Sequence, residues 1–168
     1  GRLGRASFMG DGAAVNSGEQ SLGIQGGDVT THGHFGDAKL IDQVGYAAAV
    51  GWSGRYSVTV AVGGIRFVAP IRTSDLVTVT AKLVYTGTSS MHFAIDVRAR
   101  DPMQDGGDRL CTHCVIVFVA LDGVEGRPVA VPAWQPEDPD DQRLAEYALK
   151  VMALSKDIEQ AVASLRQA

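Results

Sequence analysis

A change in hydrophobic period near Gly54 constrains the fold more than any other feature of the chain. Between residues 37 and 50 the apolar side chains recur at spacings of three and four, which is typical of an α-helix: Leu40, Ile41, Val44, Ala47 and Ala48. Asp37 is a plausible N-cap, and Gly51 a plausible stop. Beyond Gly54 the period becomes two, which predicts strands. One apolar helix followed by strands predicts an α+β fold with the helix on one face of the sheet.

Alternating, β-branched segments predict a meander of at least four antiparallel strands after the helix. The predicted strands are 57–62, 76–85, 92–100 and 111–121, with turns at 63–64, 73–74, 87 and 106–107. Before the helix, residues 19–36 are rich in glycine, which favours loops and at most one short strand near 22–24. Few residues of the helix are polar, so we expect most of its circumference to be buried.

The two ends of the chain differ from its middle. Residues 1–18 have almost no periodicity and are predicted to be a flexible tail, so the folded domain spans residues 19–140. Residues 141–168 predict a C-terminal helix with an apolar stripe from Leu144 to Leu165. This stripe requires a partner, either the domain itself or another subunit.

Composition excludes several functional classes. The 168 residues carry a net charge of -4 without a basic stripe, so a nucleic-acid partner is not expected. The longest apolar run, residues 47–50, is far shorter than a membrane span. The N-terminal residues do not resemble a secretory signal, and two cysteines cannot form a disulfide framework. We therefore expect a cytoplasmic protein.

Two groups of residues invite a metal hypothesis. Cys111 and Cys114 have a spacing found in redox and zinc motifs, but residues three apart in a strand face opposite sides. We predict that they are buried structural cysteines. His32, His34 and Asp37 also have ligand chemistry, but nothing completes a coordination set, so no metal is expected.

Asp42 is the candidate for chemistry because it lies inside the most apolar helix. An unpartnered carboxylate in such a place costs several kcal/mol of desolvation. A functional role as general base would explain it. The alternative is a carboxylate that caps the helix or pairs within a subunit interface.

Several short motifs, in order and at compatible spacing, resemble those of acyl-CoA thioesterases of the hotdog fold. They are Gly33, Gly36, Leu40-Ile41-Asp42, Val58-Thr59-Val60, Phe67-Val68-Ala69-Pro70-Ile71, Gly87-Thr88-Ser89-Ser90-Met91, Val117-Phe118-Val119-Ala120 and Arg127-Pro128-Val129. The resemblance covers roughly residues 28–140. It implies a curved antiparallel sheet wrapped around the helix at 37–50. It also implies homodimers with one continuous sheet, interfacial active sites and frequent assembly into hexamers.

The resemblance implies hydrolysis of acyl-CoA to a free acid and CoA, with Asp42 as general base or nucleophile. Backbone amides of Gly36 and Asp37 at the helix start would hold the oxyanion, although Gly36 can equally be a loop glycine. No metal or redox cofactor is implied, since CoA is part of the substrate.

Other residues are assigned supporting roles by the same resemblance. Thr30 occupies a position where relatives usually carry asparagine, and His32 and His34 could replace that polar group or be solvated loop residues. Thr88, Ser89 and Ser90 match a segment that contacts CoA, or they form only a hairpin turn. The basic residues that could bind CoA phosphates are Arg55, Arg66, Arg72, Lys82 and Arg127.

Two other functions compete with thioester hydrolysis. A hotdog hydratase or dehydratase would act on the acyl chain and would require a histidine with a carboxylate, for which His34 and Asp42 are available. An acyl-CoA-binding module without turnover is the second alternative.

Overall fold

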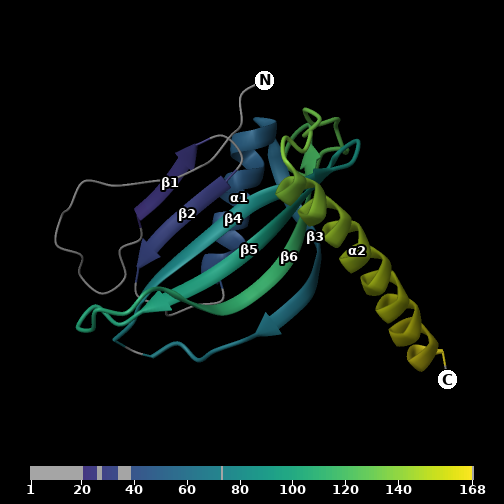
Figure 1. The fold of residues 1–168 in the computed structure, drawn as a ribbon. Coiled ribbons are helices and arrows are strands. Elements are labelled where there is room, and N and C mark those ends of the chain that lie inside the picture. The colour runs from purple at the N-terminus through teal and green to yellow at the C-terminus, as the bar shows by residue number, and fades with distance from the viewer. Residues whose placement is uncertain (1–20, 26–27, 34–38, 73, 168) are drawn as a thin grey trace.

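The computed structural model describes residues 21–25, 28–33, 39–72 and 74–167. These residues form six strands and two helices, which are labelled in Figure 1. The elements are β1 (Ser21–Gln25), β2 (Asp28–Gly33), α1 (Lys39–Ser53), β3 (Tyr56–Phe67), β4 (Leu76–Thr86), β5 (Ser90–Arg100), β6 (Arg109–Leu121) and α2 (Pro139–Arg166). None of the helices in these ranges is long and apolar enough to cross a membrane.

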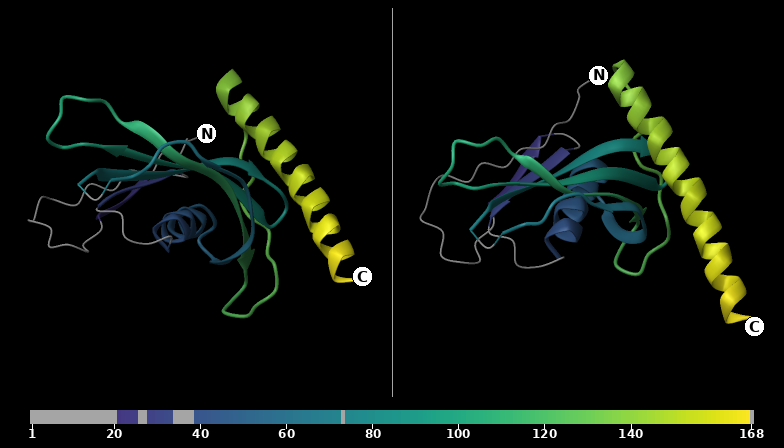
Figure 2. Two further views of the ribbon diagram at one scale, coloured as in Figure 1. Left: turned by 90° about the horizontal axis from the view of Figure 1, so that it is seen from below. Right: turned by 60° about the horizontal axis from the view of Figure 1, so that its bottom comes forward.

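The strands form one antiparallel sheet in the order β1-β2-β4-β5-β6-β3. Figure 2 shows this sheet curving around α1, which lies in its concave side. The predicted α+β architecture is therefore confirmed. The prediction of a simple meander is wrong at one point. Strand β3 pairs with β6 and forms one edge of the sheet, whereas a meander would pair it with β4. A long connection after β3 allows this crossing, and β3 becomes an edge strand.

The core lies between α1 and the concave face of the sheet. Val44, Ala48 and Ala49 of α1 are buried against side chains such as Phe93 and Phe118. Gly45 brings the helix close to the sheet, because a Cβ atom there would lie 2.8 Å from Cε2 of Phe118. The small residues on this face of α1 thus determine how tightly the sheet wraps it.

The opposite face of α1 is not buried as predicted. Asp42, Gln43 and Tyr46 are exposed. These residues recur at helical spacing and form a stripe that the sheet leaves uncovered. The helix also passes through the predicted stop at Gly51. It ends at Ser53 and is followed by Gly54, whose φ of +65° is a left-handed conformation that glycine adopts at low cost.

Two predictions about strands and turns are also wrong. The glycine-rich region before α1 forms two strands, β1 and β2, where at most one was expected. Gly63 and Gly64 form an irregularity inside β3 where a turn was predicted, since the β3–β6 register shifts between Gly63 and Arg66. Gly64 has a φ of +61°. Glycine therefore marks a bulge at this position.

The convex face of the sheet is covered by the first half of α2. This helix begins two residues earlier than predicted, with Asp138 as N-cap and Pro139 in the first turn. Ala148 packs on Val84 and Ala94, and Lys82 forms a 2.7 Å ion pair with Asp141.

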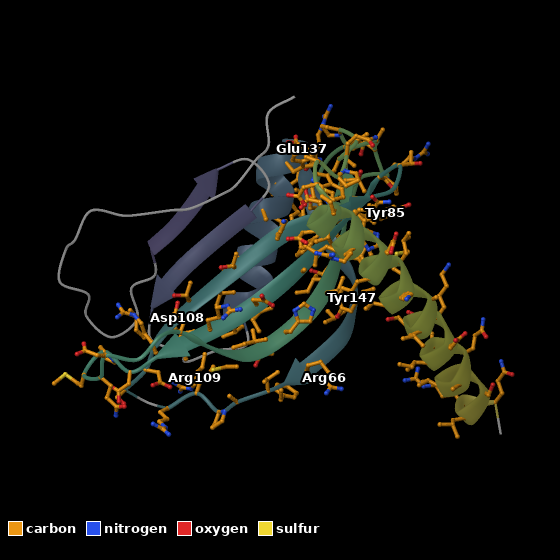
Figure 3. All side chains as sticks on the ribbon, viewed as in Figure 1. Arg66, Tyr85, Asp108, Arg109, Glu137 and Tyr147 are labelled. Atoms are coloured by element: carbon orange, nitrogen blue, oxygen red, sulfur yellow. The ribbon has the colours of Figure 1, made fainter. Side chains whose placement is uncertain are left out.

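A hydrogen-bonded chain of side chains also joins α2 to the convex face. Tyr147 projects from α2 toward the sheet (Figure 3), and its hydroxyl lies 2.9 Å from Nε2 of His113 on β6. Nδ1 of His113 lies 2.7 Å from a carboxylate oxygen of Asp96 on β5. These contacts fix the first half of α2 to its own sheet.

Candidate functional site

Asp42 lies at the open edge of the sheet. It occupies the first turn of α1, and the Thr59 hydroxyl on β3 donates a 2.9 Å hydrogen bond to its Oδ1 atom. Both side chains are exposed in the single chain. The expectation of a carboxylate buried within an apolar helix is therefore wrong for one copy of the chain. Asp42 can lose its contact with water only if another molecule or another copy of the chain covers this edge of the sheet.

The side chains of β3 suggest what covers it. Thr59 pairs with Phe118 and Ser57 with Ala120, two core residues, so these polar side chains point to the α1 side. The intervening Val58 and Val60 are 43% and 54% exposed. An edge strand that turns polar groups inward and apolar groups outward is expected to pair with another chain.

A shallow depression lies beside the C-terminal half of α1, beyond Asp42. Tyr46, one turn after Asp42, lines it together with Val50 of the same helix. Gly54, Arg55, Tyr56, Leu121 and Asp122 complete the lining. The aromatic rings of Tyr46 and Tyr56, the Arg55 guanidinium group and the Asp122 carboxylate form a polar and aromatic surface that begins one helical turn after Asp42.

The segment Thr88–Ser90 lies in the same part of the sheet. Met91, directly after it, pairs with Phe118, and Phe118 pairs with Thr59, so Met91 is two strands away from Thr59. At the usual strand spacing this separates their backbones by about 10 Å. Thr88 is exposed, whereas Ser90 lines a cavity on the convex face beneath α2. The segment thus lies two strands from the edge site, and Ser90 is directed to the convex face.

The basic residues that could bind phosphate are scattered. Lys82 is paired with Asp141 on the convex face. Arg55 lines the depression beside Tyr46, and Arg127 is bound through its backbone to Asp122, which lines the same depression. Arg55 therefore lies in this depression, and Arg127 lies next to it.

Several predicted site residues precede α1. Gly36, Asp37 and His34 lie outside the described residues, so the proposed oxyanion donors stay predictions. Thr30 and His32 are part of β2, where Thr30 pairs with Thr80 and His32 with Thr78. The placement of His32 in a loop is therefore wrong. Its glycine-rich surroundings concealed the strand.

The two cysteines are free and buried, which confirms a structural role. Burial raises the pKa of the Cys114 thiol to about 11. The β5–β6 register shifts between Val97 and Arg98, beside Cys111, and both sulfurs join the same core cluster. Strict alternation of faces along β6 therefore fails at this point. Within the described ranges no three His, Cys, Asp or Glu side chains are grouped to hold a metal ion.

Thr59 is the site residue that was not identified from its chemistry in the sequence. Its alternation with Val58 and Val60 shows a strand, but the pattern does not reveal which side faces the helix. The only indication was its place in the Val58-Thr59-Val60 motif. Thr59 and Asp42 are 17 positions apart in the sequence, and the tertiary structure brings them into hydrogen-bonding distance.

Comparison with known proteins agrees with this architecture. A sequence model described as the thioesterase superfamily matches residues 37–105, a range that contains α1, Asp42 and Thr59. The protein has the hotdog fold and matches the thioesterase superfamily. The resemblance noted in the sequence is thereby confirmed.

Two relatives illustrate the relationship at the level of sequence. Protein VdlD from Helicobacter pylori is 31% identical over 114 residues, which are 66% of this chain and 62% of VdlD. The chain thus spans less than two thirds of that relative. YkhA from Bacillus subtilis, named as an uncharacterized acyl-CoA thioester hydrolase, is 29% identical over 73% of this chain and 72% of its own.

Solved structures show the same thioesterase fold. An acyl-CoA hydrolase from Staphylococcus aureus in complex with butyryl coenzyme A and coenzyme A has a TM-score of 0.69 and 25% identity, over 83% of this chain and 95% of its own. The hexameric thioesterase y2039 from Yersinia pestis has a TM-score of 0.51 and 28% identity, over 56% of this chain and 75% of its own.

Proposed function

We propose that this protein is an acyl-CoA thioesterase that hydrolyses acyl-CoA to a free carboxylic acid and CoA, with Asp42 as its catalytic residue. The observation that carries the proposal is the hydrogen bond between Thr59 and Asp42 at the open β3 edge. It fixes a carboxylate beside an apolar strand where a second subunit would exclude water. The thioesterases among the similar proteins support the substrate class.

The reaction follows from the chemistry of a positioned carboxylate. Asp42 removes a proton from a water molecule as the water oxygen attacks the thioester carbonyl carbon. The C–S bond then breaks, CoA leaves as a thiolate, and the thiolate takes up a proton. Direct attack by Asp42 would instead give an anhydride that water hydrolyses. Thr59 is a positioning residue, since its hydroxyl occupies Oδ1 and leaves Oδ2 available for the reacting group. Neither route requires a metal or redox cofactor.

The oxyanion and CoA contacts extend the proposal to residues around Asp42. Backbone amides of Gly36 and Asp37 at the start of the helix are the proposed oxyanion donors, with Thr30, His32 and His34 as possible support. Such amides are unpaired at a helix N-terminus. Thr88, Ser89 and Ser90 are proposed to contact CoA. Arg55 and Arg127 are proposed to bind its phosphates, which is supported by their position at the depression beside Tyr46.

Self-association completes the proposed site. We propose that β3 pairs with β3 of a second copy, which extends the sheet and covers Asp42, Val58 and Val60. The exposed apolar side chains of this 12-residue strand support it. Further assembly into a hexamer is proposed from the hexameric relative.

The cytoplasm is the proposed location. Cys111 and Cys114 are both unpaired, as is usual in a reducing compartment.

A thiol-release assay tests the activity. The protein is mixed with acyl-CoAs of several chain lengths, and free CoA is followed with a thiol reagent. We expect turnover by the wild-type chain and a loss of roughly 10²–10⁴-fold in kcat for Asp42→Asn. Asp105→Asn makes the same change at an exposed carboxylate between β5 and β6, so it is the matched control and should keep its activity.

The same samples separate the alternatives. Tight binding of acyl-CoA without thiol release would indicate a binding module. A change in enoyl absorbance without thiol release would indicate a hydratase. Full activity of Asp42→Asn would remove Asp42 from the mechanism while leaving the thioesterase assignment intact.

A further inference from the structure

The second half of α2 extends beyond the sheet on which the helix lies. Figures 1 and 2 show α2 crossing the convex face and projecting past β3. The helix is close to its own sheet as far as Ser155, whose Oγ atom would lie 2.5 Å from a Cβ atom at Gly63. Every residue from 156 to 167 is exposed. At 1.5 Å per residue, the overhang to Arg166 is about 16 Å long.

The face of α2 that contacts the sheet stays apolar along this overhang. Tyr147 and Val151 point to the sheet, and the spacing of three and four residues continues with Leu154, Ile158, Val162 and Leu165. We call these last four residues the overhang stripe, although Leu154 lies just before the overhang itself. Their exposed fractions are 62%, 64%, 41% and 77%. Outside this stripe the overhang is mostly polar or charged. The sheet-facing side of α2 therefore stays apolar beyond Ser155, the last residue of the helix in close contact with its own sheet.

An apolar groove connects the overhang stripe to the strand edge. It is lined by Val62 and Ile65 of β3 and by Leu154 and Ile158 of α2. A strand added to β3 would therefore come to lie beside this groove and beneath the stripe. Its outward-facing valines would provide an apolar surface for the helix.

We infer that the overhang of α2 crosses the β3 edge and packs on the convex face of a second copy of the chain. This inference rests on the β3–β3 pairing proposed above. A two-fold axis makes the contact reciprocal, so each helix straps the two sheets together. The antiparallel pairing places the partner's Val58 and Val60 near the overhang stripe, and both valines are exposed on the unpaired strand.

Mixed cross-linking tests the contact directly. One sample carries Ile158→Cys and the other carries Val58→Cys or Val60→Cys, so a disulfide between the two introduced thiols can only join different copies. The native thiols, at Cys111 and Cys114, are buried. We expect a covalent dimer with the cross-linked peptide identified by mass spectrometry. Ala153→Cys, on the opposite face of α2, is the matched control and should not cross-link. An Ile158→Cys mixture that cross-links no better than this control would overturn the inference.

Charge on the overhang stripe provides a second measurement. Leu154→Glu combined with Ile158→Glu should raise the dimer dissociation constant at least tenfold in analytical ultracentrifugation, with unchanged helical content. Ala153→Glu should change the constant less than twofold. Dimers that persist unchanged would contradict the inference, even if a larger assembly is lost, because the stripe would then contact something other than the dimer partner.

The thiol-release assay separates this inference from the proposed function. If the mixed cross-link forms in a protein that hydrolyses no acyl-CoA, the contact between the α2 overhang and the second copy is supported and the enzyme assignment fails. If hydrolysis depends on Asp42 but no cross-link forms, the inferred contact of the α2 overhang is wrong and the enzyme assignment is supported.

Discussion

The hydroxyl of Thr59 on β3 and the carboxylate of Asp42 on α1 are joined by a hydrogen bond of 2.9 Å. This contact links the central helix to the unpaired edge of the sheet. A donor that binds one carboxylate oxygen restricts how the other oxygen can point. Hydrogen bonds to charged groups are typically worth about 1.5–3 kcal/mol.

Removal of this hydrogen bond should slow hydrolysis. Thr59→Val keeps the shape of the side chain but removes the donor, so we expect kcat to fall roughly 10- to 100-fold with little change in KM. Thr59→Ser retains a hydroxyl and should recover most of the rate. Steady-state kinetics with one acyl-CoA provide the comparison. Equal rates for the valine and serine variants would show that the hydrogen bond has no catalytic role.

Acid should destabilise the protein through His92 on β5. This side chain is 1% exposed beneath α2, and burial lowers its pKa from 6.5 to about 4. Above pH 6.5 the ring is neutral in the folded and unfolded chains. Between pH 6.5 and 4 only the unfolded chain gains a proton, so the free energy of unfolding should fall by about 2–3 kcal/mol.

The variant His92→Phe isolates this effect, because it keeps an aromatic ring that cannot titrate. Urea denaturation at pH 7 and pH 4.5 gives the free energies. We expect the difference between the two pH values to be smaller in the variant by about 2 kcal/mol. The same pH dependence in both proteins would assign the acid sensitivity to other groups.

A charge on the outward side of β3 should separate the subunits. Val60 is 54% exposed in the single chain and would be buried by strand pairing. Burial of a valine is worth about 1.5–3 kcal/mol, so Val60→Lys should raise the dimer dissociation constant roughly 10- to 100-fold and lower activity in parallel. Val124→Lys, at an exposed position outside the strands, is the control. Sedimentation of Val60→Lys as an undisturbed dimer would argue against β3 pairing.

A methyl group at Gly45 should disturb the contact between α1 and the sheet. The added Cβ would lie 2.8 Å from Cε2 of Phe118 and 3.3 Å from Cδ1 of Ile95, in a buried site. Overpacking of this kind typically costs about 1–3 kcal/mol, which exceeds the gain in helix propensity from alanine. Thermal denaturation of Gly45→Ala measures it. Gly106→Ala, where a Cβ meets nothing within 4 Å, should leave the melting temperature unchanged.

Hydrophobic periodicity alone was enough to predict α1, β4, β5 and β6, whereas the end of β3 was placed too early. A helix with apolar spacings of three and four and strands with alternating β-branched residues are local patterns, and α1, β4, β5 and β6 agree with them within a few residues. The order of short motifs around Leu40-Ile41-Asp42 was similarly sufficient to indicate the thioesterase superfamily. Both the periodicity and the motifs depend on residues that are close together in the sequence.

Contacts between distant residues were decided only by the tertiary structure. The place of β3 beside β6 exposes Val58 and Val60 and turns Thr59 toward Asp42, whereas alternation looks the same for either face of a strand. Burial of Asp42 was inferred from the apolar residues around it along the helix, yet its side of α1 faces the sheet edge. Which side of a helix or strand is covered depends on the neighbours that the fold supplies, and local sequence does not encode these neighbours.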